Sequence, residues 1–397
     1  MLNEHMLNAK QLEVINATAP VVAEHAETIA STFYPLMFER YPSVRSMFNM
    51  RHQQTGAQPR ALARSVVAYA LNRNDPQALE QMMAPIVNKH VAINLRPDQY
   101  NIVGECLMAA IGEVLGDAVT PEIADAWSGL YWEFAHRLMD TEEATYQKLE
   151  QAPGGWRGER DFYLADRVQE SNEVVSFYFK PSDEKPITSF KPGQYIGVSL
   201  DIEGQHALRQ YSLTSDPKAD YYRISVKREA QGLASSYLHD HLRVGDHVKL
   251  LPPVGELVLD ERDAPVMLVS AGVGQTPMIS LVEQALVAGR QVVYLHGARH
   301  HQVHAFRDHL DALVERYGDQ LTYRFVYSEP TSEETGRYKG MIDRSLLADY
   351  LPKGETPSCY FIGPVPFMRD VDTALEELGV PVEHRHYEYF GPSSSLH

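Results

Sequence analysis

The stretch APVMLVSAGVGQTPMISLVEQALVAGRQVVYLHGAR, residues 264–299, decides the fold of the C-terminal part of the chain. It places an apolar strand before a glycine-rich turn, followed by an amphipathic helix and a second apolar strand. Such alternation is typical of a parallel sheet covered by helices. We therefore predict an α/β domain over residues 263–397.

The turn AGVGQTP is the first candidate binding site of this domain. Its backbone N–H groups and the following helix N-terminus can hold a pyrophosphate, and Gly272 and Gly274 let the backbone approach closely. GPVPFM, residues 363–368, is a second glycine turn that follows a strand, although taken alone it could equally be a structural turn. The residues predicted to bind a dinucleotide are Gly272, Val273, Gly274, Gln275, Thr276, Pro277, Gly363 and Pro364.

Upstream, residues 155–262 show short alternating strands separated by turn residues. VVSFYFK, GQYIGVSL, LRQYSLTS, YYRISVKRE and DHVKLLP are examples, with one helical interlude, GLASSYLHDHL. This pattern predicts a small antiparallel β-barrel. The segment QAPGGWRGER, residues 151–160, is rich in Gly and Pro and marks the boundary with the region before it.

The stretch RQYSLTS, residues 209–215, suggests what the barrel binds. Arg209, Tyr211 and Leu213 should project from one side of the strand, while Gln210, Ser212 and Thr214 project from the other. A guanidinium, an aromatic ring and hydroxyl donors suit a flavin with its pyrophosphate. An ordinary half-buried strand with a surface arginine is the alternative.

The neighbouring stretches favour the flavin. PGQY ends at Tyr195, and Ser235 and Ser236 lie at a helix N-terminus where N–H groups can meet a phosphate. These stretches, in this order before the dinucleotide turn, resemble the ferredoxin–NADP reductase family of flavoproteins. The residues predicted to bind flavin from the barrel are Tyr195, Arg209, Gln210, Tyr211, Ser212, Ser235 and Ser236.

Residues 1–150 have helical apolar spacing almost throughout, with Pro20, Pro42, Pro76, Pro97 and Pro121 near the breaks. Leu79, Met82, Met83, Ile86, Val87 and His90 recur at steps of three and four, so His90 should point inward. The last helix carries Trp127, Tyr131, Phe134 and Leu138 on one stripe that continues to Glu142. The pattern predicts an all-α domain with a histidine on a buried face.

His90 has two interpretations. A single histidine on an apolar face is ordinarily a core residue, and Tyr34 could equally be an amphipathic core residue. Other helices, however, supply Tyr34, Phe48, Gln58 and Leu62. An imidazole on one side and a tyrosine and a glutamine among apolar residues on the other suit a haem that binds O₂.

Composition limits the partners. The 397 residues carry a net charge of −17, without a Lys/Arg cluster, which argues against nucleic acid and anionic membranes. No run is long enough to cross a membrane, the N-terminus lacks a secretory signal, and Cys106 and Cys359 lie far apart. We predict a cytoplasmic protein without a disulfide framework and expect a monomer.

Over nearly its full length the chain resembles the flavohaemoglobins, which are nitric oxide dioxygenases of bacteria and fungi. The matching stretches are FYPLMF, YPSVRSMFNM, NKHVA, PDQYNIVGE, APGGW, GQYIGV, RQYSLT, YRISVKRE, AGVGQTPM and HYEYFGP. The resemblance implies a globin domain with haem b, an FAD barrel and an NAD(P) domain.

The resemblance also implies roles for single residues. His90 is then the proximal haem ligand, Tyr34 donates a hydrogen bond to bound dioxygen, and Gln58 and Leu62 line the distal pocket. Tyr100 and Glu142 act as partners of His90. The remaining cofactor-binding residues that it implies are Phe48, Lys89, Glu388, Tyr389, Phe390, Gly391 and Pro392, with Lys89 and Glu388 between haem edge and flavin and Phe390 over the flavin ring.

The implied activity is conversion of NO and O₂ to nitrate with electrons from NAD(P)H. A globin that carries or senses O₂ or NO, kept reduced by the other domains, is the alternative, and a flavin reductase that has lost haem is a narrower one. The chain departs from the family at Ile362 and Pro366, where Cys and Gly are common. Arg299, in the histidine-rich HGARHH, could accept the 2′-phosphate of NADPH, so NADH and NADPH both stay open.

Overall fold

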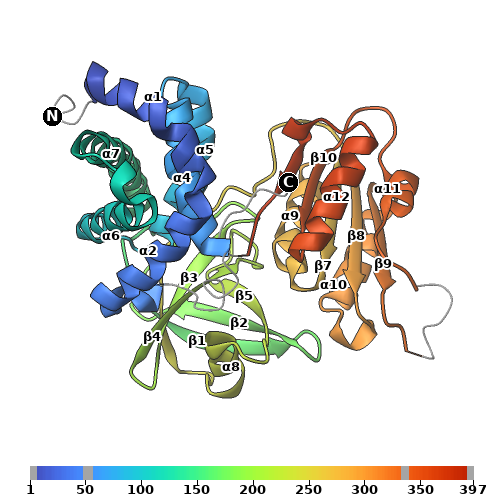
Figure 1. The fold of residues 1–397 in the computed structure, drawn as a ribbon. Helices are drawn as coiled ribbons and strands as arrows, with labels where there is room; N and C mark the ends of the chain where they lie inside the picture. Colours follow the sequence, from blue (N-terminus) through green and yellow to red (C-terminus); the bar gives the residue numbers. More distant parts are fainter. Residues whose placement is uncertain (1–6, 48–56, 332–338, 391–397) are drawn as a thin grey trace. The chain divides into compact units, whose positions relative to one another are not determined.

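The computed structural model describes residues 7–47, 57–331 and 339–390. The chain divides into two compact units, whose main segments are Met1–Gln151 and Ala152–Tyr389. The first contains only helices among its described residues, and the second contains two sheets (Figure 1).

The first unit is a helical bundle. Its elements are α1 (Ala9–Glu24), α2 (Ala26–Arg40), η1 (Pro42–Met47), α4 (Ala57–Asn72), α5 (Pro76–Val91), α6 (Pro97–Leu115), η2 (Gly116–Ala118) and α7 (Pro121–Gln151). Pro76, Pro97 and Pro121 are first residues of helices, where a missing N–H has no cost. Pro20 was predicted near a break but lies inside α1.

The predicted stripe of α7 forms part of the core of this unit. Trp127, Tyr131, Phe134 and Leu138 are all buried, and Glu142 on the same stripe is only 3% exposed. On α5, Leu79, Met83 and Val87 are buried, as the spacing predicted. The helix periodicity therefore brings a carboxylate and the inward face of α5 into the same interior.

The first sheet of the second unit is antiparallel, with strand order β4-β3-β6-β1-β2-β5. Its strands are β1 (Arg160–Gln169), β2 (Val174–Pro181), β3 (Tyr195–Ile202), β4 (Gln205–Ser212), β5 (Tyr222–Lys227) and β6 (His247–Leu250), with helix α8 (Leu233–Asp240). A bridge between Leu213 and Ile224 links the ends of the edge strands β4 and β5. The sheet thereby closes around an apolar core, which confirms the predicted barrel.

The second sheet is parallel, with strand order β11-β10-β7-β8-β9. Its strands are β7 (Val266–Ala271), β8 (Val292–Ala298), β9 (Leu321–Tyr327), β10 (Ser358–Ile362) and β11 (Arg385–Tyr387). The helical elements between them are η3 (Gly272–Gly274), α9 (Gln275–Val287), η4 (His301–Val303), α10 (Arg307–Tyr317), η5 (Gly318–Gln320), α11 (Arg344–Tyr350), α12 (Val365–Glu377) and η6 (Val382–His384).

Helices cover both faces of the parallel sheet (Figure 1). Side chains of α9 and α10 share one apolar cluster with the sheet, and side chains of α11 and α12 share another. All strands point the same way, so the turns after β7, β8 and β10 meet at one edge. This is the edge where open α/β sheets bind ligands.

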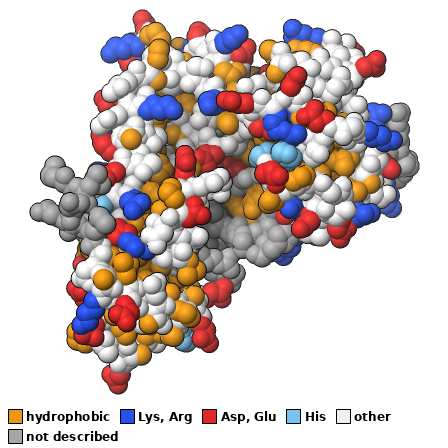
Figure 2. Space-filling view, turned by 90° about the horizontal axis from the view of Figure 1, so that it is seen from above, with side chains coloured by type: hydrophobic (Ala, Val, Ile, Leu, Met, Phe, Trp, Pro, Cys, Tyr) orange, Lys and Arg blue, Asp and Glu red, His pale blue; other side chains and the backbone are white. Residues whose placement is uncertain are grey.

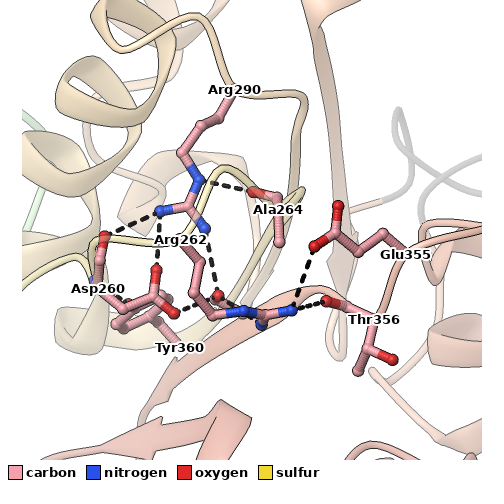
Figure 3. Close-up of polar contacts among 8 residues, drawn as sticks. Asp260, Arg262, Ala264, Arg290, Glu355, Thr356 and Tyr360 are labelled. Atoms are coloured by element: carbon pink, nitrogen blue, oxygen red, sulfur yellow. Dashed lines mark hydrogen bonds and ion pairs between the residues drawn. The ribbon is translucent and has the colours of Figure 1, made fainter.

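A polar cluster fastens the loop that leaves the barrel to the opposite edge of the parallel sheet (Figure 3). Arg290 donates to the Asp260 carboxylate at 2.9 Å, to the Ala264 carbonyl at 2.6 Å and to the Ser358 hydroxyl at 3.2 Å. Burial works to raise the pKa of Asp260, but the Ser358 hydroxyl and the Arg290 guanidinium hold that pKa below its ordinary value. Arg262 adds a bond to the Thr356 carbonyl, at 2.8 Å.

Charges are mixed on the surface. On the face seen in Figure 2, Lys and Arg side chains lie among acidic ones, not in a basic patch of their own. None of the helices in the described part of the chain is both long and apolar enough to cross a bilayer.

Candidate functional site: a haem pocket and a flavin–nucleotide module

His90 lies in the last turn of α5, and one of its ring nitrogens is held inside the protein. Nδ1 is 2.6 Å from Oε1 of Glu142 on α7 and 3.1 Å from the hydroxyl of Tyr100 on α6. Because an ionised carboxylate only accepts hydrogen bonds, Nδ1 carries the proton in this arrangement. Nε2 then has a lone pair available for a metal ion.

The partners of His90 are themselves fixed. The Tyr100 hydroxyl donates to Glu142 at 2.6 Å, and the Tyr131 hydroxyl donates to the Tyr100 carbonyl at 2.7 Å. Burial and then the Glu142 charge raise the pKa of Tyr100, so its hydroxyl stays protonated and remains a donor. Tyr131 was recognised in the sequence as part of the apolar stripe on α7, but its hydrogen bond to α6 could not be predicted.

These residues suit haem. The Glu142 side chain is 4% exposed, whereas the His90 side chain is 27% exposed. A buried carboxylate therefore holds the imidazole at Nδ1, while part of the ring stays accessible. A histidine whose second nitrogen donates to a carboxylate is the arrangement commonly found at metal-ligating histidines. These residues therefore fit haem: His90 would hold the iron through Nε2, and the iron would supply the redox chemistry.

The predicted distal residues are only partly described. Tyr34 on α2 is 6% exposed, and burial raises its hydroxyl pKa, so it is a neutral donor. Leu62 on α4 is half-buried. Phe48 and the side chain of Gln58 lie outside the described residues, so their predicted roles stay predictions.

In the barrel, Arg209 and Tyr211 are neighbours on one side of β4, as predicted. Burial lowers the pKa of Arg209, and no acid pairs with its guanidinium in the described part of the chain. Its one hydrogen bond there goes to the Leu208 carbonyl, at 2.7 Å. A partly desolvated guanidinium without a carboxylate suits the pyrophosphate of FAD. Tyr211 packs against the barrel core.

The predicted alternation continues beyond Tyr211, although strand β4 itself ends at Ser212. Leu213 belongs to the apolar core of the barrel and forms a bridge with Ile224, another core residue. The Thr214 hydroxyl lies 2.9 Å from that of Ser225, whose neighbour Ile224 points into the core, so both hydroxyls lie on the other face of the sheet. Gln210 is exposed and Ser212 is buried.

Tyr195 begins β3 and is 7% exposed. Burial raises its pKa well above the ordinary value, and the nearby carboxylates of Glu388 and Glu256 raise it further. Tyr195 and Glu388, both predicted to bind flavin, therefore lie near each other. Sequence reasoning missed Glu256. The turn residue Gly255 before it, with φ of 127°, was the available signal.

At α8 one detail of the prediction is wrong. The N–H of Ser236 is donated to the Gly232 carbonyl at 2.9 Å, within the helix, so it is not free for a phosphate. Ser235 lies in the first turn, and its hydroxyl donates to the Gly232 carbonyl at 3.2 Å. The helix begins three residues before Ser236, which explains the difference.

The dinucleotide turn has the predicted strand–turn–helix geometry. Gly272 has φ of 55°, a left-handed value. A Cβ on Gly274 would stand 2.4 Å from the Ile362 carbonyl oxygen, so only glycine fits. Val273 lies between them, and the Thr276 hydroxyl donates to the Val273 carbonyl at 3.0 Å. Within α9, Gln275 and Pro277 are buried.

Gln275 adds an observation that favours a ligand. Its side-chain amide nitrogen is buried and has no hydrogen-bond partner among the described residues. Buried amide donors are rarely left unpaired in native proteins. A bound dinucleotide would supply an acceptor for this nitrogen.

The second turn lies beside the first because β10 pairs with β7. A Cβ on Gly363 would stand 2.5 Å from the Phe367 ring, and Pro364 is the N-cap of α12. Ile362, which departs from the family pattern, is buried beneath Gly274 and is 1% exposed.

The other predicted residues lie on α5 and in the segment after β11. Lys89 is next to His90 on α5, and Tyr389 follows Glu388 after β11. Phe390 is 46% exposed. Gly391 and Pro392 lie outside the described residues. The positions of Lys89 and Glu388 between haem and flavin stay a prediction.

The histidine-rich segment does not form a metal site. Among the described residues no group of three or more His, Cys, Asp or Glu side chains is arranged to hold a metal ion. Arg299, by contrast, pairs with the carboxylate of Glu173.

Family models match three parts of the chain. The globin model matches residues 31–138, the oxidoreductase FAD-binding domain matches residues 161–259, and the oxidoreductase NAD-binding domain matches residues 268–373. Together with the geometry above, they define an oxidoreductase that joins a globin to a flavin and nicotinamide-nucleotide module.

Curated relatives match over almost the whole chain. The flavohemoprotein of Pseudomonas putida is 45% identical over 98% of this chain and 100% of its own length. That of Pseudomonas aeruginosa is 44% identical with the same coverage. The chain therefore belongs to the flavohaemoprotein family.

Solved structures agree. The flavohemoglobin of Malassezia yamatoensis, with bound FAD and heme, has a TM-score of 0.84 at 30% identity, covering 97% of this chain and 100% of that one. The flavohem-like FAD/NAD-binding domain of the nitric oxide dioxygenase of Vibrio cholerae has a TM-score of 0.55 at 35% identity, covering 59% of this chain and 100% of that one. The predicted fold and the predicted cofactors, haem, FAD and a nicotinamide dinucleotide, are confirmed.

Proposed function

We propose that this flavohaemoprotein is a nitric oxide dioxygenase that converts NO and O₂ to nitrate with electrons from NAD(P)H. One NAD(P)H supplies two electrons, enough to convert two molecules of NO and two of O₂ to two nitrate ions with release of one proton. The reductase domains of the Vibrio cholerae relative, a nitric oxide dioxygenase, support this proposal.

One observation carries the proposal: the imidazole of His90 donates to a buried carboxylate on a chain that also contains a reductase. A carboxylate at Nδ1 makes the imidazole a stronger electron donor to a metal. A reductase on the same polypeptide can renew the electrons after each reaction. A globin that only stores O₂ needs neither continuous electron supply nor a strongly donating ligand.

The cofactors would supply the redox chemistry, and the residues of the chain would hold and orient the reacting groups. Bound haem would supply the redox-active iron at which NO and O₂ react, and bound FAD would supply the step from hydride to single electrons. Glu142 and Tyr100 hold His90 in one orientation and one tautomer. The buried hydroxyl of Tyr34 would donate a hydrogen bond to a diatomic ligand on bound haem and stabilise its partial negative charge.

In the second unit, the glycine turns position the nicotinamide dinucleotide at the carboxyl edge of the parallel sheet. Arg209 holds the flavin pyrophosphate, and Tyr195 and Tyr211 orient the flavin. By family resemblance, Lys89 and Glu388 lie on the route from flavin to haem and Phe390 covers the flavin ring. We further propose three domains, residues 1–150, 155–262 and 263–397, in a monomeric cytoplasmic protein.

Turnover tests the proposal. Purified protein in air, given NADH or NADPH and then NO, should show a haem Soret band with flavin absorption and consume NO until the nucleotide is exhausted. Nitrate should accumulate in proportion to NO. Consumption of only one NO per haem would instead make the chain a carrier or sensor that its reductase keeps reduced.

A further inference from the structure

The carboxyl end of β8 is the position at which dinucleotide-binding sheets distinguish NADH from NADPH. β8 pairs with β7, the strand that carries the turn Gly272–Gly274, and it ends at Ala298. In dinucleotide-binding sheets an acid at this position binds the ribose 2′-hydroxyl, whereas an arginine accommodates a 2′-phosphate. Arg299 is the first residue after β8, so by position alone it favours NADPH.

In the structure Arg299 already forms an ion pair. Its guanidinium pairs with the carboxylate of Glu173, which precedes β2 in the barrel, with side chains 48% and 30% exposed, respectively. Because one carboxylate already neutralises this guanidinium, a 2′-phosphate would have to displace Glu173 or share Arg299 with it.

Glu173 is held in place by its neighbours along the chain. Its carbonyl accepts from the Arg228 N–H at 2.8 Å, and the Asn172 N–H donates to the Gln302 carbonyl at 2.8 Å. On the other side, Val174 packs into the apolar cluster of the parallel sheet. These contacts fix the backbone of Glu173 beside Arg299, so only the two side chains lose conformational freedom when the ion pair forms.

A second acid lies on the same edge. The N–H of Glu329, in the loop after β9, donates to the Arg299 carbonyl at 2.8 Å, and Glu329 is exposed. The backbone of Glu329 is thus next to that of Arg299, and the three side chains of Glu173, Arg299 and Glu329 together carry a net negative charge. A phosphate dianion would be repelled there, whereas a ribose hydroxyl can donate to a carboxylate.

We propose that Glu173 is a specificity-determining residue, which neutralises Arg299 and makes the chain select the dinucleotide without a 2′-phosphate, NADH. This inference rests on the proposed function only as far as hydride transfer to the flavin. It does not depend on reaction with NO or on the haem.

The test compares kcat/KM for NADPH and NADH in the full-length holoprotein, with ferricyanide as electron acceptor and without O₂ or NO. Wild type should prefer NADH. Glu173→Gln keeps the size of the side chain but frees the Arg299 charge, and should raise the NADPH/NADH ratio of kcat/KM about tenfold. Adding Arg299→Ala to Glu173→Gln should return the ratio to the wild-type value.

Glu377→Gln is the matched control. Glu377 is the last residue of α12 and forms an exposed ion pair with Arg344, the first residue of α11. The substitution breaks this ion pair, which lies far along the chain from the β8 edge. Its ratio should equal that of wild type. The proposal is overturned if wild type prefers NADPH, or if Glu173→Gln changes the ratio no more than Glu377→Gln does. Loss of NO consumption with an intact NADH preference would count against the dioxygenase alone.

Discussion

Two clusters of histidine and tyrosine side chains in this molecule differ in how the histidine ring nitrogens are used. In the helical unit, His90 has a carboxylate at one ring nitrogen and leaves the other for a ligand. In the parallel sheet, both nitrogens of His304 lie within hydrogen-bond distance of tyrosine hydroxyls, Tyr323 at 2.6 Å and Tyr327 at 3.0 Å.

The second cluster is extended by His296, whose ring lies 4.8 Å from that of His304 and whose Nδ1 is 2.8 Å from the Ser270 hydroxyl. Burial, and then His304, lower the pKa of His296 well below its ordinary value, so it stays neutral. The comparison teaches that tyrosine neighbours alone do not distinguish a metal-ligating histidine from a core histidine. A carboxylate at one ring nitrogen, with no partner at the second nitrogen among the described residues, does distinguish them.

The strongest test of this comparison replaces each histidine in turn. His90→Ala should abolish haem binding and reduce NO consumption by roughly a hundredfold or more, because the axial ligand is lost. His304→Gln should keep its full haem content. Soret absorbance per protein measures both. Wild-type haem content in His90→Ala would refute the assignment.

A second test exchanges the tyrosines. Tyr34→Phe removes a hydroxyl that should face an external ligand, and should speed O₂ dissociation about a hundredfold and reduce NO consumption. Tyr323→Phe removes a hydroxyl that serves only an internal imidazole and should leave O₂ dissociation unchanged. Flash photolysis gives both rates. An unchanged rate in Tyr34→Phe would remove Tyr34 from its role.

The charge of the acceptor is tested by Glu142→Gln. The amide can still accept from Nδ1, so haem should be retained, but the imidazole becomes a weaker donor and NO consumption should fall about tenfold. The iron–histidine stretching frequency, read by resonance Raman spectroscopy, should fall as well. Glu143→Gln, one residue along α7, is the control and should change neither quantity.

The smallest expected effect concerns stability. His296 is neutral when buried, whereas in the unfolded chain it binds a proton below a pKa of about 6.5. Its contribution is therefore complete above that pH and decreases as the pH falls below it, by up to about 1.4 kcal/mol per pH unit. His296→Asn should weaken the acid destabilisation of the reductase unit in calorimetry. Replacing the exposed His241 with Gln should not.

Local patterns predicted much of this molecule. The stripe from Trp127 to Glu142 is buried as the helical period requires, and the glycines after β7 take the conformation that the strand–turn–helix pattern indicated. Both predictions depend on residues close together in the sequence.

What could not be predicted depends on contacts between distant segments. The Arg299–Glu173 pair joins residues 126 positions apart, and no period connects them. Helix α8 begins earlier than the phosphate-binding prediction assumed, so the N–H of Ser236 donates to the Gly232 carbonyl within the helix.

The cluster around Asp260 also has a consequence for synthesis on the ribosome. Asp260 meets Arg290 only 30 residues later, but meets Ser358 after 98 residues. A chain leaves the ribosome with its N-terminus first, so the barrel can form before the parallel sheet. Asp260 can then bind Arg290 once α9 has been synthesised, and it can bind Ser358 only after β10 has been synthesised. The order of translation thereby makes the loop after the barrel one of the last parts of the reductase unit to be secured.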